Sequence, residues 1–95
     1  MPAYVIADIN VTDPKGYAEY KRLASEAVAK LGGRYLVRGG VVESMEGNWK
    51  PERVVVLEFD TLSGARTWRE SHEYNEALKL RSDSAVIQMI VVEGA

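Results

Sequence analysis

Apolar residues recur with two different periods along the chain, and these periods predict its first two elements. Residues 3–11 alternate between two faces, one wholly apolar, which predicts a strand. Asp13, with Thr12 as an alternative, is a good helix N-cap. Over residues 17–31 apolar side chains step by three and four, which predicts a helix with one buried stripe. The pair Gly32-Gly33 is expected to end it.

A second glycine pair, Gly39-Gly40, interrupts the next extended segment. The pattern predicts a strand from about Arg34 to about Ser44, with the glycines inside it. Glycine within a strand often marks a bend or a bulge, and a bulge re-aims its neighbours. We therefore expect a bulge here that directs the Arg38 side chain. Residues 45–52 combine Gly, Asn and Pro and predict a loop.

The second half of the chain predicts two strands with a helical segment between them. The strands are residues 53–59 and 84–92, and the helical segment opens at Asp60 or Thr61. A break is expected near His72, after which the helix restarts. The side chains expected to face inward from this segment are Leu62, Ala65, Trp68, Tyr74, Leu78 and Leu80.

The resulting order, β-α-β-β-α-β, predicts a single ferredoxin-like α+β domain over residues 1–95. Such a domain has a four-stranded antiparallel sheet with two helices on one face. In residues 53–59 and 84–92, however, both alternating faces are largely apolar. A sheet face left in water should instead alternate with polar residues. We therefore expect an identical subunit to cover the second face, the alternative being a bare apolar sheet.

Composition narrows the class of protein without naming a reaction. The 95 residues are 46% hydrophobic and 27% charged, which is typical of a globular domain. A net charge of −2 argues against nucleic acid or acidic lipid as a partner. The chain has no cysteine, and its start lacks the pattern of a signal peptide. These features predict a cytoplasmic protein that does not enter membranes.

Known catalytic and cofactor motifs are missing from the sequence. The single histidine, His72, is a weak basis for a zinc site, and no nucleophile elbow is present. The glycine pairs lack the spacing of phosphate-binding loops. We therefore expect neither a metal nor another cofactor.

Charged residues beside apolar segments are the remaining candidates for chemistry. Arg38 and Glu58 could form an ion pair across neighbouring strands at the dimer interface, because a buried charge is costly unless it is paired. Alternatively, Arg38 or Arg81 could bind a small organic anion, since a guanidinium fork fits a carboxylate. The sequence leaves both interpretations open.

Aromatic residues would complete such a pocket. Trp68 and Tyr74 would line its apolar part, although Trp68 could equally be a core filler. His72 would be its only acid or base that titrates near neutral pH. Trp49, on the predicted loop, should pack down onto the domain or reach a partner.

Four stretches of the chain resemble a known family. They are MPAYVIADINVTDPKGYAEY, GGRYLVRGG, MEGNWKPERVVVLEFD and SHEYNEALKLR, and they are similar to the family called domain of unknown function 1330. The resemblance covers nearly the whole chain, and G-G-R-(Y/F)-L-V-R-G-G with E-G-x-W-x-P-x-R is its most specific part. The matching positions are Gly33, Arg34, Arg38, Gly39, Gly40, Glu46, Gly47, Trp49, Arg53, Glu58, Trp68, Tyr74 and Arg81.

This resemblance implies membership of the dimeric α+β-barrel superfamily, in which ferredoxin-like protomers pair sheet to sheet. That superfamily includes cofactor-independent monooxygenases, small cyclases and isomerases, and haem enzymes, with pockets between helices and sheet. Many relatives would have proline at the position of His72, which weakens the case for His72 as a catalytic residue of the family. The catalytic candidates are then Glu58, His72 and Tyr74, and the ligand-binding candidates are Arg38, Trp49, Trp68 and Arg81.

Two functions of different classes follow. The first is a dimeric enzyme or binding protein for a small, partly apolar and anionic organic molecule. The second is a non-catalytic dimeric regulatory or interaction module whose charges form structural pairs. A cavity of a few hundred Å³ bordered by Trp68 and either Arg38 or Arg81 would favour the first function, and a filled core the second.

Overall fold

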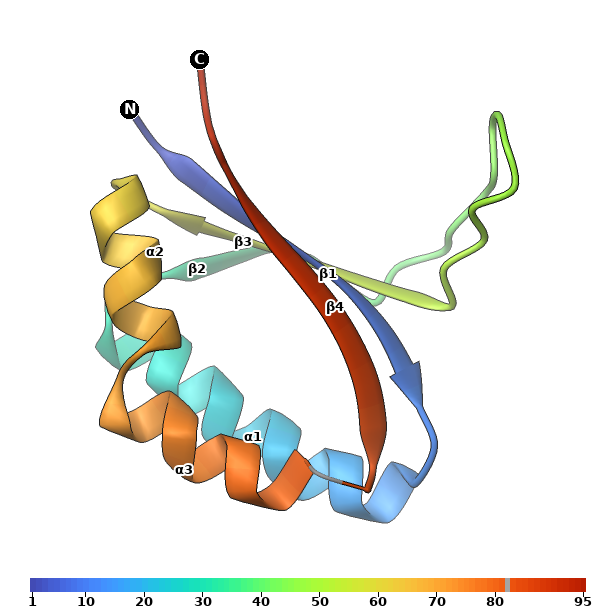
Figure 1. Ribbon diagram of the computed structural model, residues 1–95, viewed down its shortest axis with the longest axis horizontal. Helices are drawn as coiled ribbons and strands as arrows, with labels where there is room; N and C mark the ends of the chain where they lie inside the picture. Colours follow the sequence, from blue (N-terminus) through green and yellow to red (C-terminus); the bar gives the residue numbers. More distant parts are fainter. Residues whose placement is uncertain (82) are drawn as a thin grey trace.

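The fold is a twisted four-stranded antiparallel sheet with all helices on one face (Figure 1). The computed structural model describes residues 1–81 and 83–95. Strands follow the order β2-β3-β1-β4 across the sheet. This confirms the expected ferredoxin-like α+β fold, with the second helical segment split in two. The elements are β1 (Ala3–Val11), α1 (Pro14–Lys30), β2 (Arg34–Arg38), β3 (Arg53–Phe59), α2 (Leu62–Arg69), α3 (His72–Arg81) and β4 (Ala85–Glu93).

Local sequence signals set the ends of α1. The Asp13 side chain accepts a hydrogen bond from the Lys15 backbone N–H at 3.2 Å, so Asp13, not Thr12, is the N-cap. Gly32 follows the helix with a φ of 86°, a left-handed conformation that glycine adopts without strain. The buried side of α1 carries Tyr17, Tyr20, Ala24, Ala27 and Val28.

A serine makes the break between α2 and α3. Ser71 Oγ donates to the Trp68 carbonyl at 2.7 Å and accepts from the Tyr74 N–H at 3.0 Å. It thereby ends one helix and starts the next, which confirms the break expected near His72. The expectation that Leu80 faces inward is wrong, because it lies on the outer side of α3 and is 42% exposed. No helix among the described residues is long and apolar enough to cross a membrane.

The second strand is shorter than its sequence predicts. β2 ends at Arg38, and the irregular pairing with β3 lies between Tyr35 and Val37, before the glycines rather than at them. Gly39 makes one last hydrogen bond, from its N–H to the Val54 carbonyl at 3.0 Å. β3 begins only at Arg53, so the later residues have no strand to pair with.

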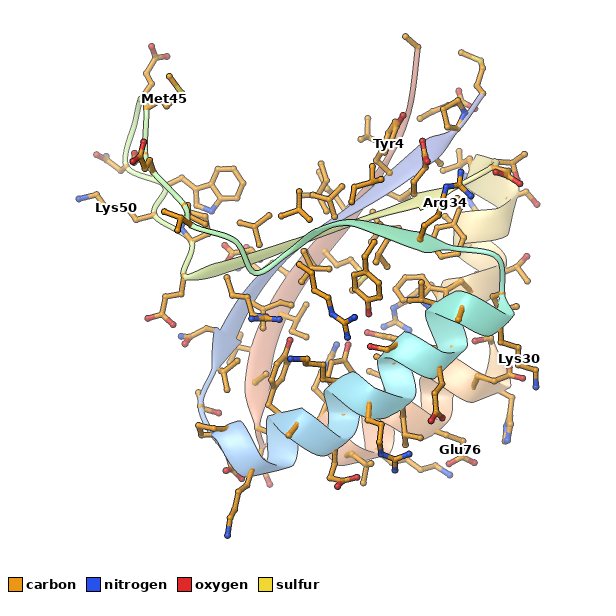
Figure 2. All side chains as sticks on the ribbon, turned by 180° about the vertical axis from the view of Figure 1, so that it is seen from behind. Tyr4, Lys30, Arg34, Met45, Lys50 and Glu76 are labelled. Carbon is orange, nitrogen blue, oxygen red and sulfur yellow. The ribbon has the colours of Figure 1, made fainter. Side chains whose placement is uncertain are left out.

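Residues 39–52 instead form a loop, here called the arm, that projects from the sheet (Figure 1). Figure 2 shows Met45 at its far end, away from the helices. The arm touches the domain through Trp49, whose Nε1 donates to Asp8 Oδ2 at 3.0 Å. Trp49 itself stays 63% exposed, so the arm covers little of the sheet.

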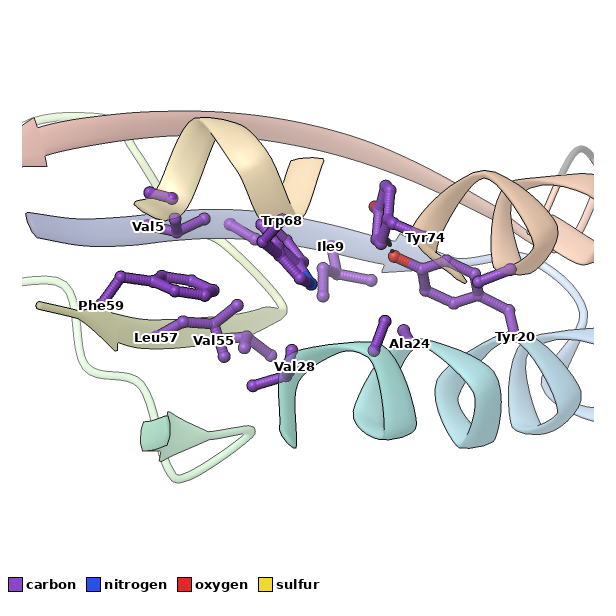
Figure 3. Close-up of a cluster of buried hydrophobic side chains, with 14 of the residues drawn as sticks. Val5, Ile9, Tyr20, Ala24, Val28, Val55, Leu57, Phe59, Trp68 and Tyr74 are labelled. Atoms are coloured by element: carbon purple, nitrogen blue, oxygen red, sulfur yellow. Dashed lines mark hydrogen bonds between the residues drawn. The ribbon is translucent and has the colours of Figure 1, made fainter. Parts of the chain in front are cut away.

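The sheet face opposite the helices, here called the open face, carries several exposed apolar side chains. Val86 and Ile90 on β4 are each 62% exposed, and Leu36 on β2 is 52% exposed. The helix side of β1 and β3 is buried and holds the core, against which Ile87 and Met89 of β4 pack partly buried (Figure 3). The doubly apolar pattern of β3 and β4 therefore reflects one face in the core and one in solvent.

Candidate functional site

Trp68 lies between two cavities in the layer that separates the helices from the sheet. The outer cavity, about 350 Å³ and half-open to solvent, lies against α2, β1 and β4. The inner cavity, about 40 Å³, lies between α1 and the sheet. Four residues line both: Val5, Trp68, Ile87 and Met89. Trp68 is 2% exposed and comes from the inward face of α2.

Arginines surround the outer cavity. Its floor is apolar, whereas Arg66, Arg69 and Arg81 contribute cationic side chains and Glu70 the single carboxylate. None of the three guanidiniums forms an ion pair within residues 1–81 and 83–95. The outer cavity therefore combines an apolar surface with positive charge that the described part of the chain leaves unbalanced.

Behind this cavity two buried tyrosines join α1 to α3. Tyr20 Oη and Tyr74 Oη are 2.8 Å apart and hydrogen-bonded (Figure 3). Arg81 Nη1 donates to Tyr74 Oη at 3.4 Å, and Arg69 Cζ lies 4.9 Å from the centre of the Tyr74 ring. Burial, with the neighbouring Tyr74, raises the pKa of Tyr20 far above its usual value, so this hydroxyl stays protonated.

The inner cavity has its own cationic border, formed by Lys21, Arg38 and Arg53. Arg38 Nη2 donates to Ser25 Oγ at 2.5 Å, and its Cζ lies 4.2 Å from the centre of the Tyr35 ring. This geometry places Arg38 on the helix side of β2. The arginine has no carboxylate partner in the described residues.

The ion pair between Arg38 and Glu58, one of the two interpretations of the sequence, is not formed. Glu58 accepts from Arg34 Nε at 2.9 Å, and Arg34 Nη2 also donates to Asp60 at 3.1 Å. The reason is register: Arg34 lies directly opposite Glu58, whereas Arg38 pairs with Val55. Since Val55, Leu57 and Phe59 face the helices, Glu58 points to the open face.

Two buried nitrogens at the inner cavity have no hydrogen-bond partner. They are Trp68 Nε1 and Arg53 Nε, and no other buried side-chain nitrogen or oxygen within residues 1–81 and 83–95 is unpaired. Both residues line the inner cavity. In Figure 3 the indole of Trp68 extends from α2 with its nitrogen directed toward the space near Ile9 and Val28.

The structure brings some of the sequence-predicted residues together and separates others. Trp68 and Arg81 line the outer cavity, and the ring of Tyr74 packs against Trp68 with centroids 4.7 Å apart. Arg38 lines the inner cavity, as Trp68 also does. His72 does not join them: its side chain is 82% exposed and its Nε2 lies 3.4 Å from Glu76 Oε1.

Glu58 and Trp49 also lie apart from both cavities, on the open face and on the arm. Sequence reasoning gave no role to Tyr20, Arg66 or Arg69, since nothing in a helical stripe distinguishes a core residue from one at a cavity. Arg53 was noted only as a charged residue at the start of a predicted strand and as the last position of E-G-x-W-x-P-x-R, with no role at a cavity. No cluster of three His, Cys, Asp or Glu side chains suited to a metal occurs among the described residues.

Solved structures with the same fold include proteins of several descriptions. A protein of unknown function from Rhodopseudomonas palustris is 18% identical with a TM-score of 0.77, covering 99% of this chain and 82% of that one. SnoaB, a cofactor-independent oxygenase from Streptomyces nogalater, is 7% identical with a TM-score of 0.68, covering 99% and 93%. A putative antibiotic biosynthesis monooxygenase from Nitrosomonas europaea is 19% identical with a TM-score of 0.59, covering 99% and 98%. At these identities the likeness establishes the fold alone.

Sequence comparison is more decisive than these structural likenesses. No curated protein sequence matches the chain. The model of one family, the domain of unknown function DUF1330, matches residues 2–95. That match spans the sheet, both cavities and the arm, and it includes the glycine pairs and the arginines described above. The chain therefore belongs to the DUF1330 family.

Proposed function

We propose that the chain binds a small organic anion with an apolar or aromatic body in the outer cavity. The observation that supports this is the cavity itself, with about 350 Å³ of space beside Trp68 and three arginines that form no ion pair within residues 1–81 and 83–95. Ligand pockets usually have volumes of roughly 300–1,000 Å³, apolar walls and a few polar groups. Three of the site residues predicted from the sequence, Arg81, Trp68 and Tyr74, have a part in this proposal.

Each side chain has a part in this binding. Arg81 and Arg69 would hold the anionic group, because a guanidinium fork donates two parallel hydrogen bonds to a carboxylate. The ring of Trp68 and the apolar floor would hold the body of the ligand. Tyr74 would fix Arg81 in place through its hydroxyl, which Arg81 already approaches at 3.4 Å.

As the enzymatic form of this function we propose cofactor-independent chemistry on an ionised substrate. Proteins of the same fold include one described as a cofactor-independent oxygenase. Arginines around an apolar pocket would stabilise the anion formed when a phenol or enol loses its proton. Tyr74 lies behind the cavity and reaches it only through Arg81, so its part in this chemistry would be to orient that arginine. Glu58 and His72 are not among the residues that line the cavity.

Binding is tested by thermal shift with a panel of aromatic and alicyclic carboxylates, compared with their amides. Carboxylates should raise the melting temperature of the wild-type chain, because a ligand that binds only the folded state stabilises it. Arg81→Met should remove this rise, whereas Lys79→Met, an exposed position on the same helix, should not. An unchanged rise in Arg81→Met would refute the proposal.

Catalysis is tested with the carboxylates and phenols that bind, by following oxygen consumption and product formation. Turnover that Tyr74→Phe lowers while binding persists would support the enzymatic form. Binding without turnover, in the presence of oxygen and without added metals, would show that the chain is a binding protein and not an enzyme for these compounds.

We also propose that two copies pair through the open face. The chain exposes 6188 Å², compared with about 5,500 Å² for a typical monomer of 10.6 kDa. The difference is close to the roughly 800 Å² that each partner buries in a standard interface. Pairing would cover Val86 and Ile90, which are otherwise in water.

A non-catalytic dimeric module is the second candidate. The ion-pair cluster of Arg34, Glu58 and Asp60 beside the open face favours it, because those charges are structural pairs. This candidate predicts a dimer that no carboxylate in the panel stabilises. The thermal-shift experiment therefore distinguishes the two functions.

A further inference from the structure

We propose that the inner cavity is a second binding site, for a small oxyanion the size of formate, acetate or bicarbonate. It is separate from the outer cavity, and the proposal does not depend on the function assigned there. Its basis is a pair of buried donors that have no partner in the described part of the chain, Trp68 Nε1 and Arg53 Nε, on two residues that line the same cavity.

Unpaired buried donors are rare because leaving one without a partner costs free energy. The Trp68 side chain is only 2% exposed, and its indole nitrogen is buried away from bulk water. Two such donors on residues that line one cavity call for acceptor atoms there. An oxyanion supplies two acceptor oxygens on one small group.

The charge of the cavity border selects an anion over water. The border includes Lys21, Arg38 and Arg53 but no aspartate or glutamate. Arg53 forms no ion pair in the described chain, and its Cζ lies 5.7 Å from the centre of the Tyr17 ring. A water molecule could accept a hydrogen bond, but it would leave these positive charges unbalanced.

The backbone at Gly39 leaves room for the Arg53 guanidinium. Gly39 has a φ of 74°, and any side chain at this position would collide with the guanidinium. The chain therefore packs bare backbone against one side of Arg53, where a larger residue would push the arginine away. Gly39 therefore has a structural role besides its place at the end of the strand, which is to accommodate the Arg53 side chain.

The size of the cavity limits the ligand. About 40 Å³ is more than one water molecule needs and much less than the few hundred Å³ typical of drug-sized ligands. Lys21 and Arg38 are exposed, so the cavity opens to solvent between α1 and β2. An aromatic carboxylate would fit the outer cavity but would not enter the inner one.

The indole N–H of Trp68 reports directly on an acceptor. In a ¹⁵N–¹H spectrum the chain should give two indole signals, and Trp49→Phe identifies that of Trp68. Formate or acetate, exchanged for chloride at constant ionic strength, should shift the Trp68 signal downfield and saturably. Benzoate should not reproduce this shift.

Variants then assign the site. Arg53→Met keeps the aliphatic stem and should weaken formate binding at least tenfold, and Arg53→Lys should restore only part of it. The matched control, Arg34→Met, removes an arginine from the neighbouring strand β2 that does not line the cavity, and it should bind formate like the wild type. Arg81→Met should also leave formate binding unchanged, because Arg81 lines only the outer cavity.

Three results would overturn the proposal. The first is a Trp68 signal that does not saturate with formate or acetate. The second is an equal response to chloride, which would exclude oxyanion selectivity. The third is an unchanged affinity in Arg53→Met. Should Arg53→Met fail to fold, Arg53→Lys, which keeps the charge but lacks Nε, provides the same comparison.

Discussion

At the scale of single residues, the two glycines that follow Arg38 have different structural roles. Gly39 combines a φ of 74° with close contact to the Arg53 guanidinium. Gly40 has neither feature, and nothing lies within 4 Å of where its Cβ would be. The sequence places them side by side as an apparent pair, yet only the first is required by the geometry.

Gly39→Ala should therefore destabilise the domain, whereas Gly40→Ala should leave it nearly unchanged. A left-handed conformation costs a non-glycine residue about 1–2 kcal/mol, and the φ of Gly39 lies in that region. Urea unfolding of the two variants measures the difference. Equal stabilities would mean that Gly39 is not held in this conformation.

The buried tyrosine pair is a second feature at this scale. Tyr20 and Tyr74 share one hydrogen bond, with Arg81 as a further donor to Tyr74. Removing one hydroxyl leaves the other buried with a lost partner, at a cost of about 1–3 kcal/mol. Removing both hydroxyls leaves no unpaired group between the rings.

Tyr20→Phe should therefore cost more in unfolding free energy than the further step to the double variant with Tyr74→Phe. A double-mutant cycle by urea unfolding gives the coupling between the two hydroxyls. Additive single effects would show that the hydroxyls act independently. The raised pKa of Tyr20 adds a pH dependence: its stability contribution is complete below the unfolded value of 10.0 and is lost as pH rises above it.

At the scale of elements, an exposed ion pair links α1 to α3. Lys30 Nζ lies 2.7 Å from Glu73 Oε2, joining the last turn of one helix to the first turn of the other. The hydrogen bond from Lys30 is the main cause that lowers the pKa of Glu73. Figure 2 shows Lys30 at the end of α1 beside the helix that carries Glu76.

Because the folded-state pKa of Glu73 is lowered, its contribution to stability is present above 4.5, its reference value, and is lost as pH falls through the folded value. Glu73→Gln should therefore reduce the acid-induced loss of stability below pH 4.5. Thermal unfolding from pH 3 to pH 7 measures this change. The control is Glu26→Gln, whose ion pair with Arg22 lies within α1; equal pH profiles for both variants would contradict the assignment.

Most elements follow from local patterns in the sequence, but the end of β2 does not. The cap at Asp13, the stop at Gly32 and the break at Ser71 act within a few residues of the chain, so the sequence predicts them well. β2 was predicted to reach Ser44 because Val41 and Val42 favour strands. Whether they pair depends on how far β3 extends, and a local pattern does not contain that distance.

At the scale of the whole molecule, the sheet has two different faces. The helices and core cover one, while the other exposes Leu36, Val86 and Ile90. A side-chain hydrogen bond from Trp49 to Asp8 links the arm to this open face. A second copy is the occupant that we propose for the remainder.

Ile90→Glu should then convert a dimer into a monomer, because it places a charge at the centre of an apolar interface. Leu80→Glu, at an exposed position on α3, should leave the dimer intact. Sedimentation equilibrium at micromolar concentrations measures both. A wild-type chain that is monomeric under these conditions would refute pairing through the open face.

The sequence by itself determined the order of elements, the fold class and the family, because periodicity, caps and turn residues act over short distances. It also indicated that Arg38, Trp68, Tyr74 and Arg81 lie near apolar surface. The tertiary structure alone decided that Arg34, not Arg38, pairs with Glu58, since strand register sets which charges meet. It alone divided the space around Trp68 into two cavities and brought Arg53 to one of them, because a cavity is formed by residues far apart in the chain.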